Sequence, residues 1–263
     1  MTPVAIITGA SSGIGAELAR VFARNGHTLV LVARREARLK ALATELGAAG
    51  AMVPLILPLD LSQHDAAARI TLALEIRDLD PQYLVNNAGF GLHGYAADRD
   101  RDELLGMIDL NMRALTDLSL VFAASLARHH GGILNVASVA GFLPAPASAV
   151  YYAGKAYVIS FSEALYRELK PKGVRVTTLC PGPVHTEFQA RAGVSKRATI
   201  FHVPAARVAE EGYRGLMRGK RMVIPGFGNK LLTVLARIAP RSWLLAAAGR
   251  RQRARLTVAA PRE

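Results

Sequence analysis

Cysteine is almost absent from this sequence of 263 residues, which contains only Cys180. A single thiol cannot form an internal disulfide, so the chain is not a disulfide-stapled scaffold, and a reducing compartment is expected. Cys180 follows the apolar run 174–179, which predicts a buried structural thiol rather than a nucleophile. The seven histidines are scattered and no His/Cys group has the spacing of zinc ligands, so we predict no metal site.

Long apolar runs are also missing. No run of about 18 uncharged apolar residues is present, so no transmembrane helix is predicted. The first residues have no basic region ahead of an apolar one, which a secretory signal would need, and the first apolar run is typical of a strand. We therefore expect a cytoplasmic protein.

Acidic residues are scarce toward the end of the chain. Residues 207–263 contain 13 Lys or Arg against Glu210, Glu211 and Glu263, which gives +10 of the net charge of +13. Such a segment could contact nucleic acid, anionic lipid or an acidic partner, or could be a solvated surface with a disordered end. Aromatic residues are not interleaved with the charges, as stacking on single-stranded nucleic acid requires, so nucleic-acid binding ranks last.

Short apolar runs alternate with longer helical patterns along most of the chain. The runs do not alternate apolar with polar residues, which predicts strands that are buried on both faces. Strand–helix alternation favours a single α/β domain of the Rossmann type, doubly wound, with about seven parallel strands and helices on both faces. Strands are expected at 4–8, 28–33, 53–59, 83–86, 133–137, 174–179 and 222–225, and helices at about 14–25, 35–46, 64–77, 101–128 and 152–170.

The chain is expected to divide into a cofactor-binding and catalytic domain, 1–226, and a basic amphipathic helical extension, 227–263, packed on the same domain. Pro240 should break the extension into two helices. One interpretation is a basic amphipathic helix on an anionic membrane surface. The other, which we favour at this point, is a helix that covers the substrate site or an oligomer interface. The apolar stripes are Leu231, Leu232, Leu235, Ile238, Trp243, Leu244 and Leu245.

A glycine-rich turn, Thr8-Gly9-Ala10-Ser11-Ser12-Gly13-Ile14-Gly15, lies between the first predicted strand and the first predicted helix. Its glycines would let the backbone turn tightly and approach a pyrophosphate, and the helix N-terminus would supply N–H donors and a favourable dipole. This position predicts nucleotide binding. The spacing is G-x-x-x-G-x-G and not the G-x-G-x-x-G dinucleotide fingerprint.

The second predicted strand ends at Arg34 and Arg35, where an NAD site would normally carry a carboxylate for the ribose 2′-hydroxyl. Guanidinium groups instead suit a 2′-phosphate, which they can bind through charge-assisted hydrogen bonds. Cations at a helix start are unfavourable unless an anion is nearby. We therefore predict NADP (NADPH) as the cofactor.

Tyr151 and Lys155 are four residues apart in a predicted helix, so their side chains should lie on one face, about one turn apart. A nearby positive charge favours the phenolate and lowers the pKa of a tyrosine from its usual value near ~10, which would recruit it for proton transfer. By itself such a pair is usually a rim residue and a solvated charge, so its significance depends on the surrounding motifs.

Six motifs, in order over residues 3 to about 190, resemble those of the short-chain dehydrogenase/reductase family. The resemblance implies an oxidoreductase that transfers hydride between NADP(H) and a carbonyl or secondary alcohol. The matching positions are the glycine turn 8–15, Asp60-Leu61 as the adenine contact, the signature 86–89, Asn111 in the long helix, Ser138 before Tyr151, and the proline-glycine segment 181–186 against the nicotinamide.

The resemblance also implies the catalytic roles. Tyr151 would exchange a proton with the substrate oxygen, and Lys155 would lower its pKa and hold the nicotinamide ribose. Ser138 would orient the carbonyl, and the backbone of Asn111 would hold a water that links Lys155 to solvent. Ser138 lies thirteen residues before Tyr151, the usual spacing in the family, so Tyr151 is chosen over Tyr152.

The expected cofactor residues are Gly9, Ser11, Ser12, Gly13, Ile14, Gly15, Arg34, Arg35, Asp60, Leu61, Asn87, Ala88, Gly89, Tyr151, Lys155, Pro181, Gly182, Val184 and Thr186. Substrate contacts are expected from Ser138, Phe142, Leu143, Tyr151 and Phe188, with 186–204 as a mobile lid that includes Phe201. These aromatic and aliphatic residues suggest an apolar ketoacyl, steroid-like or alicyclic substrate, although they could equally be core.

An alternative function is an NADP-binding redox sensor or scaffold without turnover. Such a protein would have no chemical need for all four of Asn111, Ser138, Tyr151 and Lys155, which are present. By resemblance alone we expect a homodimer or homotetramer built on the helices at 101–128 and 151–170.

Overall fold

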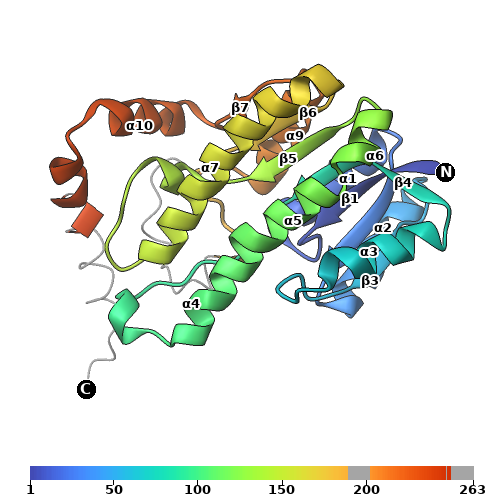
Figure 1. Cartoon of the computed structure of the whole chain (residues 1–263), viewed down its shortest axis with the longest axis horizontal. Coiled ribbons are helices and arrows are strands. Elements are labelled where there is room, and N and C mark those ends of the chain that lie inside the picture. Colours follow the sequence, from blue (N-terminus) through green and yellow to red (C-terminus); the bar gives the residue numbers. More distant parts are fainter. Residues whose placement is uncertain (189–201, 247, 250–263) are drawn as a thin grey trace.

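Seven parallel strands form one sheet at the centre of the molecule (Figure 1). The computed structural model describes residues 1–188, 202–246, 248 and 249, and its strand order is β3-β2-β1-β4-β5-β6-β7. The doubly wound α/β architecture predicted from the sequence is confirmed. The strands are β1 Thr2–Thr8, β2 Thr28–Ala33, β3 Leu55–Pro58, β4 Leu79–Asn86, β5 Gly132–Val136, β6 Arg175–Leu179 and β7 Met222–Val223.

Helices pack on both faces of the sheet because strand side chains point alternately to the two faces. In β1, Ala5 and Ile7 belong to one buried cluster, whereas Val4 and Ile6 belong to another. The first cluster includes residues of α1 (Gly13–Arg24), α2 (Glu36–Ala48) and α9 (Ala205–Met217). The second includes residues of α3 (Ala66–Glu75), α5 (Ala114–Val121), α6 (Ala123–Arg128) and α7 (Ala149–Leu169).

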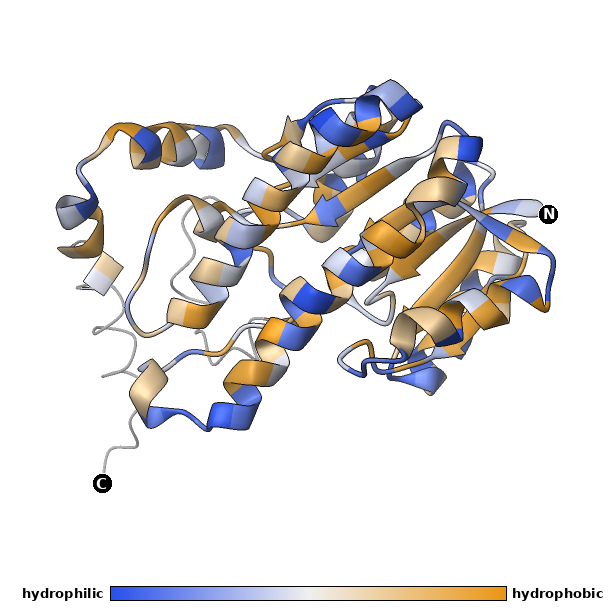
Figure 2. Cartoon of the chain, in the orientation of Figure 1, coloured by the Kyte–Doolittle hydropathy of each residue, from blue (hydrophilic) through white to orange (hydrophobic). Residues whose placement is uncertain are grey.

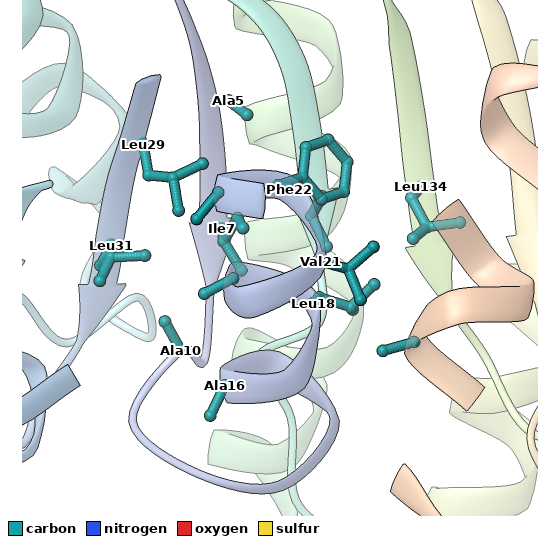
Figure 3. Packing of buried hydrophobic residues seen from close by; sticks show 14 of the residues in the cluster. Ala5, Ile7, Ala10, Ala16, Leu18, Val21, Phe22, Leu29, Leu31 and Leu134 are labelled. Carbon is teal, nitrogen blue, oxygen red and sulfur yellow. The ribbon is translucent and has the colours of Figure 1, made fainter. Parts of the chain in front are cut away.

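Helix α1 illustrates this packing (Figure 3). Leu18, Val21 and Phe22 recur at helical spacing and are almost completely buried, in one cluster with Ile7 of β1 and Leu134 of β5. Burial of a side chain of this size contributes roughly 1.5–3 kcal/mol. The glycine-rich turn that precedes α1 is therefore anchored by a strand on one side and by a well-packed helix on the other.

The sequence analysis missed helix α9. Its buried positions are Val208, Ala209, Gly212, Gly215 and Leu216, which follow helical spacing. Because three of the five are glycine or alanine, the apolar stripe is weak in the sequence, although Pro204 just before the helix is a start signal.

The single helix predicted at 101–128 is interrupted in the structure. Helix α4 (Arg101–Ile108) passes through a π-helical segment, η2 (Asp109–Arg113), into α5, and Phe122 separates α5 from α6. Such π-bulges are frequent at functional sites. The only fully buried residue of η2 is Asn111, one of the predicted catalytic residues.

The strand order reverses between β1 and β4: the chain runs from β1 outward through β2 and β3, and then returns to β4 on the other side of β1. Ligands of open α/β sheets bind beyond the carboxyl ends of the strands at such a switch point. β1 ends at Thr8 and β4 ends at Asn86. The glycine turn and the 86–89 signature therefore meet where a ligand is expected.

The chain after β7 turns at Gly226, whose φ is 84°, and enters α10 (Phe227–Ile238). Residues 241–246 are helical again beyond Pro240, so the predicted break is confirmed. Residues 250–263 of the predicted extension lie outside the described residues. Within the described residues, no helix combines the length and the apolar composition that crossing a membrane requires.

Candidate active site

Thr8, the last residue of β1, ties the glycine turn to the 86–89 signature. Its hydroxyl donates to Val85 O at 3.0 Å and accepts from the backbone N–H groups of Asn87 (2.9 Å) and Ala88 (3.0 Å). The Asn87 amide donates in turn to Thr8 O at 2.9 Å. A Cβ at Gly9, which has a φ of +66°, would lie 2.8 Å from Ala88 Cα. The two loops thus touch through backbone. Thr8, which the sequence analysis included in the glycine turn but not among the expected cofactor residues, holds them together.

The start of α1 is suited to an anion, and the Glu187 carboxylate already hydrogen-bonds the Ser12 side chain there. Gly13 begins the helix, and Ser12 at its N-cap makes no side-chain capping bond. The first N–H groups of an uncapped helix are available to a phosphate or similar group. A Cβ at Gly13 would lie 3.0 Å from a side-chain carbon of Thr186. Thr186, which is also a predicted cofactor residue, therefore lies beside the glycine turn.

Three arginines gather where β2 ends and α2 begins. Arg35 donates to Ser11 Oγ at 3.1 and 3.2 Å and forms an ion pair with Glu187 at 2.7 Å. Arg38, which the sequence analysis did not select, lies 3.5 Å from the other oxygen of Glu187. The hydrogen bond and charge of Arg35 lower the pKa of the Glu187 carboxyl. Arg35 thus links the glycine turn to a carboxylate that follows Thr186.

Arg34 pairs instead with Asp60, at 3.5 Å. Asp60 also accepts from the backbone N–H and hydroxyl of Ser62 at 3.0 and 2.8 Å. Burial acts to raise the pKa of Asp60, but the hydrogen bonds from Ser62 and the charge of Arg34 outweigh it, so the pKa is lowered. Leu61, by contrast, is buried in the second core cluster.

Tyr151, Ser138 and Lys155 come together at the carboxyl end of the sheet, as predicted. Lys155 Nζ lies 5.9 Å from the centre of the Tyr151 ring. Burial raises the pKa of Tyr151, and its hydrogen bond with Ser138 acts in the opposite direction. Ser138 Oγ also accepts from Ala140 N at 3.1 Å and donates to Pro181 O at 3.4 Å, which connects it to the proline-glycine segment.

Lys155 is buried and donates to Val136 O, the last residue of β5, at 2.8 Å. Burial lowers the pKa of its ammonium group to about 8. The expected lowering of the Tyr151 pKa by Lys155 is not present in this arrangement, because burial of the phenol dominates and its pKa is raised. The ammonium faces a backbone carbonyl here rather than the phenol oxygen.

Asn111 holds the loop after β4 with its side chain. Its amide nitrogen donates to Phe90 O at 2.8 Å, and its carbonyl oxygen accepts from Phe90 N at 3.1 Å. A Cβ at Gly89 would lie 2.8 Å from that oxygen and 3.9 Å from Lys155 Nζ. The π-bulge therefore brings Asn111, the signature loop and Lys155 to one place. The prediction that its backbone holds a water stays a prediction.

Gly141 allows the segment after Ser138, η3 (Val139–Phe142), to lie directly on α7. A Cβ at Gly141 would lie 2.6 Å from Lys155 O. Ala140 and Gly141 thus fix the turn that begins at Ser138 against the helix that carries Tyr151 and Lys155. This contact sets the relative positions of the three predicted catalytic side chains.

The predicted substrate residues do not all lie beside Tyr151 in the structure. Phe188 lies beside Tyr151, with ring centres 5.7 Å apart, and Leu143 is half-buried after η3. Phe142 instead packs against the third core cluster, and Arg237 of α10 lies over its ring at 5.1 Å. Most of the predicted lid, residues 189–201 with Phe201, lies outside the described residues.

The proline-glycine segment is held from two sides. Val184 is buried in the first core cluster, and Pro181 O accepts from Val139 N at 3.0 Å. A Cβ at Gly182 would collide with the side chain of Asn229 in α10. Helix α10 is thereby packed against the segment expected to face the nicotinamide. Cys180, just before it, is buried and its pKa is raised to about 12 by burial, as expected of a structural thiol.

A network of buried polar side chains, which the sequence analysis missed, connects the elements that carry this site. Asn86 Nδ2 donates to Asn135 Oδ1 at 2.9 Å and to Ser119 Oγ at 3.0 Å, and Asn135 Nδ2 donates to Ser162 Oγ at 2.9 Å. All four side chains are buried. Buried polar groups are costly without partners, so this hydrogen-bond network fixes the relative positions of β4, β5, α5 and α7.

A doubly wound sheet, a glycine turn at its switch point and a Ser–Tyr–Lys group beside it together define a nucleotide-binding oxidoreductase. The model of the short chain dehydrogenase family matches residues 3–196. The chain therefore belongs to the short-chain dehydrogenase family, and it is an oxidoreductase that acts on alcohols or carbonyls.

Individual relatives agree with this assignment. The chain is 38% identical over 217 residues to a sulfoacetaldehyde reductase of Chromohalobacter salexigens, which covers 80% of this chain and 85% of the relative. A short-chain dehydrogenase from Sphingobium yanoikuyae in complex with NADPH is 32% identical, with a TM-score of 0.79 over 100% of this chain and 97% of the other. A family member from Burkholderia phymatum in complex with NAD is 26% identical, with a TM-score of 0.78 over 89% and 92%.

Proposed function

We propose that this chain is an NADP(H)-dependent oxidoreductase that interconverts an apolar carbonyl compound and its secondary alcohol. The observation that carries the cofactor assignment is the group of Arg34, Arg35 and Arg38 at the end of β2, with Arg35 bonded to Ser11 of the glycine turn. Guanidinium groups there suit a 2′-phosphate. The Sphingobium yanoikuyae relative, which binds NADPH, is consistent with this assignment.

The residues present fit a dinucleotide. The β1 and β4 loops meet through glycine and backbone, and α1 offers uncapped N–H groups for the pyrophosphate. Lys155, Asn87 and Thr186 would hold the nicotinamide half. A bound nicotinamide supplies or accepts the hydride. The chain's own task is to position the substrate oxygen and to supply its proton.

Tyr151 would give its proton to the substrate oxygen during reduction and take it back during oxidation. Its raised pKa keeps the phenol protonated at neutral pH, which suits reduction. Ser138 would hydrogen-bond the same oxygen, a preorganised contact that strengthens as negative charge develops. Asn111 positions the 87–90 loop beside Lys155.

Support for an apolar substrate comes from the contact between Phe188 and Tyr151 and from Leu143 after η3. The experiment that tests the proposal is NADPH oxidation with ketoacyl, steroid-like, alicyclic and small anionic carbonyl compounds, with NADH in parallel. We expect turnover with the apolar compounds and a preference for NADPH. Turnover of the anionic compounds alone would contradict the substrate assignment, and dinucleotide binding without any turnover would favour the redox-sensor alternative.

The same assay gives the prediction for Arg35. Arg35→Ala should raise the KM for NADPH by about 10- to 100-fold, because a charge-assisted hydrogen bond contributes roughly 1.5–3 kcal/mol. The KM for NADH should stay close to that of the wild type. Arg77→Ala, at an exposed position just after α3, is the matched control. Equal losses with NADPH and NADH would refute the 2′-phosphate role.

Glu187 should compete with a 2′-phosphate for the same arginines, because its two oxygens already pair with Arg35 and Arg38. Exposed ion pairs are weak, so Glu187→Gln should lower the KM for NADPH by only about two- to fivefold and leave that for NADH unchanged. Glu45 is equally exposed, at 51%, and pairs with Arg20 between α1 and α2. Glu45→Gln should change neither KM; a rise in the KM for NADPH in Glu187→Gln would show that Glu187 does not compete.

We also propose that the chain forms a homo-oligomer through the outer sides of α4, α5 and α7. Leu105, Leu120, Val121 and Tyr157 are exposed there. The Tyr157 ring stacks on Phe161, with ring centres 5.9 Å apart, and its hydroxyl bonds Thr116 at 2.8 Å, so α5 and α7 present one continuous surface.

A further inference from the structure

Helix α10 has its polar face inward and its apolar face outward. The residues that it buries are Asn229, Thr233 and Ala236. An ordinary surface helix does the opposite and turns its apolar stripe to the core. Figure 2 shows apolar residues along α10 at the margin of the molecule. Its exposed large apolar residues are Phe227 (82% exposed), Leu231, Leu232, Val234, Leu235 and Ile238 (74%).

This orientation is fixed by specific contacts. Gly182 has no side chain, and the amide of Asn229 fills the place that a side chain there would take. Asn229 Nδ2 also donates to Pro225 O at 2.8 Å, and Arg237 lies over Phe142 of η3. Turning the apolar face inward would break these contacts. The outward apolar face is therefore a property of the fold.

The surface continues beyond Pro240. In the helical residues 241–246, Trp243 is 72% exposed and Leu245 is also exposed. The charged residues of this segment are Lys230, Arg237 and Arg241, all exposed and all positive, and of these Arg237 extends over Phe142. The sequence contains no Asp or Glu between Glu211 and Glu263. We call residues 227–246 the α10 surface.

Two partners could cover the apolar residues of this surface, a second copy of the chain or a lipid bilayer, and the charges distinguish between them. A symmetric dimer would bring the same patch of two copies together. The arginines and lysine of one copy would then face those of the other without a carboxylate in either segment, which is unfavourable. An anionic lipid surface complements both features, since the apolar side chains can enter the headgroup boundary and the cations can pair with lipid phosphates. Exposed tryptophan is also enriched at that boundary.

We propose that the α10 surface docks this protein on an anionic lipid bilayer as a peripheral helix. No described helix could span a bilayer, so docking would be interfacial. Helix α10 contacts η3, which follows Ser138, through the side opposite the docked face, so α10 would lie between the bilayer and the segment that begins at Ser138. The proposal is independent of the cofactor and substrate assignments, because it depends only on surface residues.

The test is co-sedimentation of the full chain with vesicles of phosphatidylcholine alone and of phosphatidylcholine mixed with phosphatidylglycerol. We expect binding to the mixed vesicles that falls as salt is raised, and much weaker binding to the neutral ones. The double variants Leu235→Gln/Ile238→Gln and Lys230→Gln/Arg241→Gln should each weaken binding to the mixed vesicles by on the order of tenfold or more.

Matched controls carry the same substitutions elsewhere. Leu72→Gln/Ile76→Gln changes two exposed apolar residues at α3, and Lys170→Gln/Lys172→Gln changes two exposed lysines after α7. Both should bind as the wild type does. Light scattering on every variant measures the number of subunits. Absence of vesicle binding by the wild type, or equal binding by all variants, would overturn the proposal. If the wild type does not bind vesicles and Leu235→Gln/Ile238→Gln lowers the subunit number, a second copy covers the surface.

Discussion

Tyr151→Phe is expected to lower kcat by about a thousandfold or more, since general acid–base groups contribute roughly 10²–10⁴-fold and this substitution removes the only group proposed to transfer the proton. The phenol oxygen hydrogen-bonds Ser138, and the ring lies beside Phe188 and Gly91. Phenylalanine keeps these ring contacts. The dissociation constant for NADPH, measured by fluorescence titration, should therefore stay close to that of the wild type.

Tyr152→Phe is the matched control for this prediction. Tyr152 is the next residue of α7, and its ring centre lies 6.0 Å from that of Tyr151. The two substitutions remove the same hydroxyl from neighbouring positions, so general damage to α7 would affect both. We expect Tyr152→Phe to retain turnover. Turnover retained by Tyr151→Phe but lost by Tyr152→Phe would reverse the assignment. Equal loss in both would indicate that the substitutions disturb the packing of α7 rather than proton transfer.

The residues that the sequence expected to lie together, and that do so in the structure, were placed by local rules. A glycine turn after one apolar run must lie at the carboxyl end of a strand, and so must Asn86 and Ser138. In a parallel sheet those ends share one edge, so the order of the motifs was enough to bring them together. The four-residue spacing likewise placed Tyr151 and Lys155 on one side of α7.

The parts that the sequence did not predict depend on contacts between distant segments. Nothing near Asn229 shows that it faces Gly182, yet that contact decides which side of α10 is exposed. Phe142 is predicted to contact the substrate, and nothing near it in the sequence shows that Arg237, nearly a hundred residues later, packs over its ring. The π-bulge at Asn111 also has no local signature, because its side chain bonds the backbone of Phe90 in another loop. Each case requires the tertiary structure.

Lys155→Met should raise the KM for NADPH and lower kcat by about a hundredfold or more, since the ammonium group is proposed to hold the nicotinamide ribose in position for hydride transfer. The buried ammonium group of Lys155 should also make the free energy of unfolding depend on pH, and the direction follows from its pKa. The folded-state pKa of Lys155 is about 8, below its ordinary value of 10.5, because the charged form is buried. As the pH falls from 10.5 toward 8, the unfolded chain takes up this proton before the folded chain does, so the folded state loses stability.

The free energy of unfolding of the wild type minus that of Lys155→Met should therefore increase by about 3 kcal/mol as the pH rises from about 8 to 10.5. Urea titrations over this range measure it, and taking the difference cancels groups that titrate in both proteins. Methionine also removes the hydrogen bond to Val136 O, a loss that does not depend on pH. Lys172→Met, which removes an exposed ammonium group instead of a buried one, is the matched control. A flat difference for Lys155→Met, or a decreasing one, would mean that the ammonium group is not buried as the structure places it.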